Sequence, residues 1–169
     1  KNVTYILLGL AMVIVVLMFF APEVVLLFGS EKYVDAVYVV PPVAASVFFI
    51  FLFNVFAIPQ MYFEDKRFMP IASMFAAALN LVLNFIFIRI YGYYAAGYTT
   101  LVCYIVYSIG HYYFSKKVCE KHLPGINLFE TRKIVYISIF LVVCSIVFNF
   151  LYKFTLLRYS LGILLLVIL

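Results

Sequence analysis

The sequence predicts an all-α protein, a polytopic bundle of transmembrane helices. The chain has 169 residues, of which 68% are hydrophobic and 11% are charged, whereas a soluble domain is about half apolar and about a quarter charged. Five full apolar runs of about twenty residues, the length that crosses a hydrocarbon core, fit in the chain together with part of a sixth. This composition excludes a soluble enzyme, a nucleic-acid-binding domain, a disordered chain and a secreted disulfide-rich domain.

The apolar runs are expected to form helices because backbone polar groups in lipid must be satisfied within a helix or a closed barrel. Barrel strands would alternate strictly over about ten residues, and these runs do not alternate. The runs cover residues 5–20 with a possible continuation to 28, then 39–63, 68–88, 93–114 and 134–152, and a sixth begins near 159.

The chain is expected to be an internal or truncated piece of a larger protein. Its last residue falls inside the apolar run 162–169, where a free carboxylate would be costly in a bilayer. We expect four helices over residues 1–115, a basic loop over 116–133 and two further helices over 134–169, the last one truncated.

The charged residues lie almost entirely between the predicted spans, and their distribution predicts the orientation. Eight basic residues fall on one side, namely Lys1, Lys66, Arg67, Lys116, Lys117, Lys121, Arg132 and Lys133. The other side has four basic residues and three of the acidic ones. Because basic loops are retained in the cytoplasm, we expect residue 1 and the loops 63–67 and 115–133 to be cytoplasmic in a multi-pass protein of the cell inner membrane. The net charge of +5 then reflects topology, and no nucleic-acid partner is expected.

Polar side chains follow one stripe on each of two predicted helices. Asn80 and Asn84 recur at helical spacing in the third span, and Thr100 and Tyr104 do so in the fourth. Such a stripe either packs against a neighbouring helix, with amides and hydroxyls bonded across the contact, or lines a hydrated cavity. The pattern is compatible with both. His111 lies near the basic end of the fourth span, which favours an interfacial histidine over a proton relay.

Three further residues of the spans are candidates for function. Arg89 is the one cation close to an apolar interior, and its planar fork suits phosphate or carboxylate groups; an arginine that extends to the lipid headgroups is the alternative. Asn54 is a weaker candidate in the second span. Pro59, in the same span, either kinks the helix or ends it one residue earlier. A kink there is either a hinge or a purely structural bend.

The sequence shows no arrangement for catalysis or metal binding. All seven acidic residues fall in predicted loops, and the pair Glu64 and Asp65 lies beside two basic residues, as in a solvated turn. The three cysteines lack a paired spacing for a disulfide framework or a zinc site. We therefore expect no enzyme activity, no metal and no cofactor.

Five segments stand in a recognisable order: APEVVLLFG at residues 21–29, YVDA at 33–36, QMYFEDKR at 60–67, ALNLVLN at 78–84 and YGYYAAGYTT at 91–100. Their order resembles that of one known family, the lipid-linked oligosaccharide flippases of polysaccharide and O-antigen (lipopolysaccharide) biosynthesis. The family often has a proline before the glycine of the last segment, where this chain has Arg89, Ile90 and Tyr91. The flippases belong to the superfamily that also holds the MATE multidrug exporters.

The resemblance implies the last six helices of a fourteen-helix, MATE-like transporter. The four helices over residues 1–115 would belong to its C-terminal bundle, and the two over 134–169 would be peripheral. The N-terminal bundle would be the partner of this one across a central cavity. It implies flipping of oligosaccharides linked to polyprenyl-phosphate-type lipids by alternating access, in contact with membrane lipids. Arg89 would contact the anionic group, and Asn80 and Asn84 the sugar hydroxyls. The full set of cavity candidates is Arg89, Asn80, Asn84, Thr100, Tyr104 and Asn54, with Pro59 as the hinge candidate.

Two other functions stay open. An ion-coupled multidrug exporter of the same superfamily would need a carboxylate within the membrane, and the second to fifth spans contain none. A membrane-embedded enzyme of polysaccharide assembly would need a nucleophile or base, and the sequence offers none to name.

Overall fold

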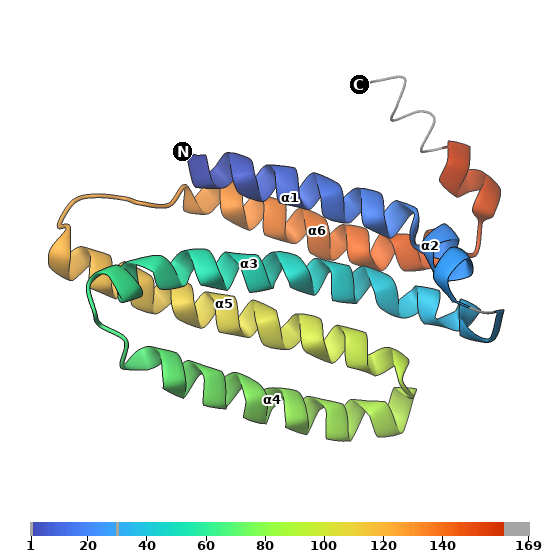
Figure 1. The fold of residues 1–169 in the computed structure, drawn as a ribbon, viewed down its shortest axis with the longest axis horizontal. Coiled ribbons are helices and arrows are strands. Elements are labelled where there is room, and N and C mark those ends of the chain that lie inside the picture. Colours follow the sequence, from blue (N-terminus) through green and yellow to red (C-terminus); the bar gives the residue numbers. More distant parts are fainter. Residues whose placement is uncertain (1, 30, 161–169) are drawn as a thin grey trace.

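The computed structural model describes residues 2–29 and 31–160 and, over these residues, contains helices and no strand. The elements are α1 (Asn2–Phe19), α2 (Ala21–Phe28), the 3-10 helix η1 (Glu31–Val39), α3 (Val40–Tyr62), α4 (Phe68–Tyr91), α5 (Tyr94–His122) and α6 (Thr131–Leu151). The five long helices lie side by side (Figure 1). The predicted helical bundle is confirmed. The sixth predicted span, which begins near residue 159, falls mostly outside the described residues. The last described residues, 155–160, are helical.

Four segments within the described residues are long and apolar enough to cross a membrane: Asn2–Phe19, Val34–Tyr62, Phe68–Tyr91 and Thr131–Leu151. These segments support a membrane protein. The fourth predicted span corresponds to α5, which is not among them because its sequence is rich in tyrosine, glycine and, towards its end, charged residues. With 29 residues, α5 is nevertheless long enough to run the length of its neighbours.

The basic loop predicted over residues 116–133 needs correction, because α5 continues to His122 and α6 begins at Thr131. Lysine and glutamate are good helix formers, and Lys116 and Glu120, one turn apart, form an ion pair of 3.7 Å. The helix ends where Pro124 and Gly125 follow, and Gly125 has a φ of +84° that favours glycine. The charges that indicated a loop therefore lie partly on an extended helix.

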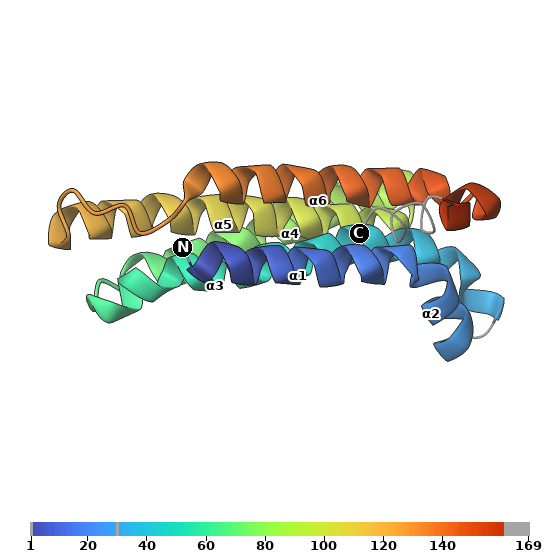
Figure 2. The same cartoon turned by 90° about the horizontal axis from the view of Figure 1, so that it is seen from above.

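The first predicted run is divided in two, because α1 ends at Phe19 and α2 leaves in a new direction (Figure 2). Pro22 lies in the first turn of α2 and has no N–H to donate to the carbonyl of Met18 four residues earlier. The Tyr152 hydroxyl donates to that carbonyl instead. A side chain of the α6 end thus satisfies the C-terminal end of α1.

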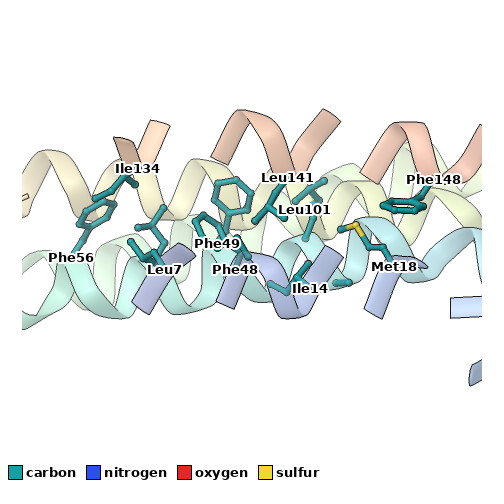
Figure 3. Close-up of a cluster of buried hydrophobic side chains, with 14 residues drawn as sticks. Leu7, Ile14, Met18, Phe48, Phe49, Phe56, Leu101, Ile134, Leu141 and Phe148 are labelled. Atoms are coloured by element: carbon teal, nitrogen blue, oxygen red, sulfur yellow. The ribbon is translucent and has the colours of Figure 1, made fainter. Parts of the chain in front are cut away.

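Helix α3 lies at the centre of the bundle and contacts α1, α5 and α6. Its buried side chains meet those of the three neighbours in one apolar core (Figure 3). The labelled core residues are Leu7, Ile14, Met18, Phe48, Phe49, Phe56, Leu101, Ile134, Leu141 and Phe148.

The most extensive helix contact joins α3 and α5, and Gly97 permits it at one end. A Cβ atom at Gly97 would lie 3.0 Å from side-chain carbons of Pro42 and Val39 and 3.3 Å from the Val39 carbonyl oxygen. Small residues at membrane helix contacts let backbones approach closely. A side chain at residue 97 would therefore press on Pro42 and Val39.

Helix α4 lies at the edge of the bundle and packs against α5 (Figure 1). Among its residues, all of which the structure describes, only Ala72 is buried. Most of its apolar surface is available to lipid or to another protein.

We predict that Gly97→Ala lowers the free energy of unfolding by about 1–3 kcal/mol, because the added methyl group forces α3 and α5 apart. The matched control is Gly110→Ala in the same helix, where the nearest atom to a Cβ, on Phe68, is 3.6 Å away. The control should be neutral or gain up to about 1 kcal/mol from helix propensity. Unfolding of the detergent-solubilised protein by SDS titration measures both variants; equal effects would contradict the close-contact role.

Candidate functional site

A seam of hydrogen bonds joins the edge helix α4 to α5. The Asn84 amide donates to Asn80 Oδ1 over 2.9 Å, and the Asn80 amide donates to Cys103 Sγ over 3.6 Å. The Thr99 hydroxyl donates to Asn84 Oδ1. Asn80 and Asn84 therefore use their polar atoms across the contact between two helices, as the packing interpretation of this stripe requires.

The seam continues towards the other end of α4 through Ser73 and Tyr107, whose hydroxyl oxygens lie 2.8 Å apart. The Tyr107 ring also packs on Phe53 of α3, with ring centroids 4.5 Å apart. Tyr107 thus links α4 to the central helix, although α4 has no extensive contact with α3 of its own.

A polar pair is enclosed between α3 and α5. The Gln60 amide donates to the His111 carbonyl oxygen and also lies 3.2 Å from His111 Nδ1. Gln60 is 0% exposed and His111 1% exposed, so both side chains are enclosed between the two helices. Gln60 Oε1 and His111 Nε2 have no hydrogen-bond partner among the described residues. Buried polar atoms normally have hydrogen-bond partners, so the two unpaired atoms make this pair energetically costly to enclose.

The remaining cavity candidates are not gathered with the asparagines. Thr100 and Asn54 each donate to the carbonyl four residues earlier in their own helix, both over 2.7 Å. Tyr104 is half-buried and its ring is nearly parallel to that of Phe53, at 5°. Pro59 is buried within α3, and the helix continues past it to its last residue, so the span does not end before the proline.

Arg89 occupies the last turn of α4 and is exposed. Its guanidinium lies 3.8 Å from the centroid of the Phe85 ring. It makes no hydrogen bond or ion pair to any residue that the structure describes. Since Phe85 and Arg89 are four residues apart, the pair covers one turn of the helix, and the N–H donors of the fork stay available.

An apolar pocket of about 630 Å³ lies between α4 and α5 beyond Asn84. Its walls are Leu83, Phe87, Tyr91, Tyr94, Ala95, Tyr98, Thr99 and Val102. Thr99 belongs both to this pocket and to the hydrogen-bonded seam. Apolar walls with few polar groups suit a hydrocarbon chain or a ring system.

The strongest ionic contact lies at the same end of the bundle and was not predicted from the sequence. Arg158 is 3% exposed, donates to both carboxylate oxygens of Glu23 and bonds the Phe19 carbonyl. The Tyr159 hydroxyl also donates to Glu23. Glu23 and Arg158 are 135 positions apart in the chain, so no local sequence pattern predicts the pair. It joins α2 to the residues that follow α6.

Comparisons with known proteins assign no relative to this chain: no family model, curated protein or solved structure matches it. Within residues 2–29 and 31–160, no three His, Cys, Asp or Glu side chains come together as metal ligands would.

We predict a measurable coupling between Asn84 and Thr99. In a double-mutant cycle of Asn84→Leu and Thr99→Val, the coupling free energy should be about 0.6 kcal/mol and at most about 1.7 kcal/mol. Thr100→Val is the matched control, because both threonines bond the Ala96 carbonyl oxygen of their own helix and only Thr99 also bonds Asn84. SDS unfolding of the four proteins of each cycle gives the values. Equal coupling of Asn84 to both threonines would show that the seam bond is absent.

We also predict that acid weakens the contact between α2 and the α6 end. Burial raises the pKa of Glu23, but hydrogen bonds from Tyr159 and Arg158 and the Arg158 charge outweigh it and hold the pKa below its ordinary value of 4.5. A carboxyl with a lowered pKa stabilises the folded state above its unfolded pKa, and this stabilisation is lost as pH falls through the folded pKa.

Thermal unfolding in detergent between about pH 3 and 7 tests this linkage. Glu23→Gln should be less stable than the wild type at neutral pH and should lose part of the decline below the ordinary pKa. Glu120→Gln, which alters a carboxylate 67% exposed in its side chain, should keep the wild-type decline. An unchanged decline in Glu23→Gln would remove Glu23 as its source.

Proposed function

We propose that this chain belongs to a membrane transporter that flips lipid-linked oligosaccharides across the cell inner membrane by alternating access. The observation that carries the proposal is the uncovered arginine of α4. Arg89 is the one charged residue of that helix, and it lies exposed with free donors in the described structure. A cation on an apolar helix is costly in a membrane unless it meets an anionic group or reaches the interface.

The substrate class combines three chemical parts, and α4 offers a group for each. A polyprenyl chain needs an apolar surface, which the pocket between α4 and α5 provides. A phosphate needs a fork of N–H donors, which Arg89 has. Sugar hydroxyls need amides and hydroxyls. Those of Asn84 and Thr99 bond each other in this structure and would be available to a sugar only where α4 separates from α5. Arg89 and the pocket residue Phe87 are two residues apart and therefore lie on nearly opposite sides of α4. The phosphate and the polyprenyl chain would therefore meet these two groups when the substrate is in different positions.

The attachment of α4 suits a helix that moves. It is held through α5, by small residues such as Ala72 and by hydrogen bonds that are individually weak in membranes. Elements with few buried contacts have the lowest local stability. A second helical bundle, expected from the family resemblance, would cover the exposed faces of α3 and α4, where Asn54 and Arg89 lie.

The excess of basic residues supports a cytoplasmic position for the turn 63–67 and the loop after α5. Substrate would then enter at that end and leave towards Arg89. Pro59 lies three residues before the end of α3. With this orientation it would be close to the entry side, where a bend would alter the approach to α4.

The test uses the host that carries the gene. Deleting the gene should abolish surface polysaccharide and leave lipid-linked repeat units inaccessible to an impermeant glycosidase added from outside. Re-expression of Arg89→Ala should restore translocation at least about tenfold less well than wild type, because charge-assisted bonds to phosphate are lost. Arg132→Ala, which removes an exposed arginine from the start of α6, is the matched control and should transport normally.

Immunoblotting of membrane fractions must show equal amounts of the variants. Normal transport by Arg89→Ala at wild-type abundance would remove Arg89 from the mechanism. The flippase function would be rejected if deletion of the gene left the accessibility of lipid-linked oligosaccharide to the external glycosidase unchanged.

A further inference from the structure

A second pocket, of about 540 Å³, lies at the opposite end of α4 and α5, where α3 turns into α4. Its walls come from residues 60–71 of α3, the turn and α4, and from residues 114–121 of α5. The residues that give it its chemistry are Gln60, Asp65, Arg67, Phe68, Lys117 and Lys121. The pocket therefore combines charges, an amide and an aromatic wall.

The charge of this pocket is predominantly positive. Arg67, Lys117 and Lys121 oppose one acid, Asp65. The ion pairs formed within residues 2–29 and 31–160 use Lys116, Lys133 and Arg158 and none of the three pocket cations. Three cations around one hollow, none of them neutralised by a close carboxylate, favour an anionic ligand.

The start of α4 adds to this field. Phe68 begins a helix of 24 residues that has no acidic residue in its first turn and no side-chain cap. The partial positive charge of the helix N-terminus is therefore uncompensated where it meets the pocket. Few free amides contribute, because the Met69 amide donates to Lys66 and residue 70 is proline, so the effect is one of charge.

Gln60 provides a second, independent indication of a ligand. Its side chain is 0% exposed to solvent and lines the pocket, and its Oε1 atom has no hydrogen-bond partner among the described residues. A carbonyl oxygen of this kind accepts a hydrogen bond from a hydroxyl group. The atom is shielded from solvent in this structure, so a ligand with hydroxyls beside its negative charge would satisfy it once the side chain turns towards the hollow.

The remaining walls indicate where the ligand comes from. Phe68 and Phe114 stack with ring centroids 3.2 Å apart, and Ile71, which follows on α4, is 63% exposed. The pocket thus opens along an apolar helix face that continues towards the membrane interior. A free inorganic anion gains nothing from such a wall, whereas the chains of a lipid do.

We propose that this pocket binds the headgroup of an anionic phospholipid whose headgroup carries hydroxyls. Arg67, Lys117 and Lys121 hold the phosphate, Gln60 Oε1 accepts a headgroup hydroxyl, and the acyl chains lie along α4. The site belongs to a resident lipid of the leaflet at this end of the bundle and does not depend on the transported substrate.

Binding of dioctanoyl-phosphatidylglycerol to the full chain in a neutral detergent, followed by native mass spectrometry, tests the proposal. The triple variant Arg67→Gln, Lys117→Gln and Lys121→Gln should bind at least about tenfold more weakly than the wild type, since each basic residue contributes to binding of an anionic headgroup. The matched control removes three charges at the same end outside the pocket: Lys116→Gln, Arg132→Gln and Lys133→Gln. It should change the affinity by less than about threefold.

Two further arms separate the source of the anion and the role of Gln60. Inorganic phosphate should not displace the lipid at equal concentration. Gln60→Leu should remove the preference for phosphatidylglycerol over phosphatidic acid, whose headgroup lacks the glycerol hydroxyls, while retaining binding of both. Equal weakening by the two triple variants, displacement by inorganic phosphate, or an unchanged preference in a folded Gln60→Leu protein would overturn the proposal.

Discussion

The close contact between α3 and α5 determines where every other element lies. It depends on the absence of a side chain at Gly97, against which Pro42 and Val39 pack. On the side away from α5, α3 packs against α1 and α6 in the apolar core, and α5 packs against α4. Because α5 supplies one wall of the hydrogen-bonded seam and one wall of both pockets, widening the α3–α5 contact would alter all three together.

The charged side chains at the two ends of the bundle are arranged differently. At one end, Glu23 and Arg158 neutralise each other, and Tyr152 satisfies the carbonyl that Pro22 leaves free. At the other end, the cations of the turn and of the α5 end surround a hollow and face no equal number of acids. A buried ion pair is a weak source of net stability but costly to break, so the first end is suited to holding helices together. The second end is suited to binding an anion from outside the chain.

The sequence predicted the helices and most of their limits, because an apolar run in a membrane has few alternatives to a helix. It predicted a loop over residues 116–133 from the charged residues there, but α5 continues to His122 and α6 begins at Thr131, because lysine and glutamate extend a helix readily. The stripe of Asn80 and Asn84 was visible, but only the position of α5 shows that the stripe meets another helix. The Glu23–Arg158 pair and the Gln60–His111 pair join distant parts of the chain, and no spacing rule reaches across such distances. The substrate roles and the hinge role stay predictions for all the candidates: Arg89, Asn80, Asn84, Thr100, Tyr104, Asn54 and Pro59.

Helix α4 is the element whose physical character differs most from that of the others. It is bound along one side, through α5, and the remainder of its surface is apolar and exposed apart from Arg89. Its two ends form walls of the apolar pocket and of the basic pocket. A rigid helix that shifts against α5 therefore changes both pockets at once. If ligands of both pockets prefer particular positions of α4, each ligand changes the affinity of the other by the same factor, since coupling free energies are reciprocal. The weakness of the seam, rather than its strength, would make such coupling possible, because a helix fixed by a large buried core has only one position to offer.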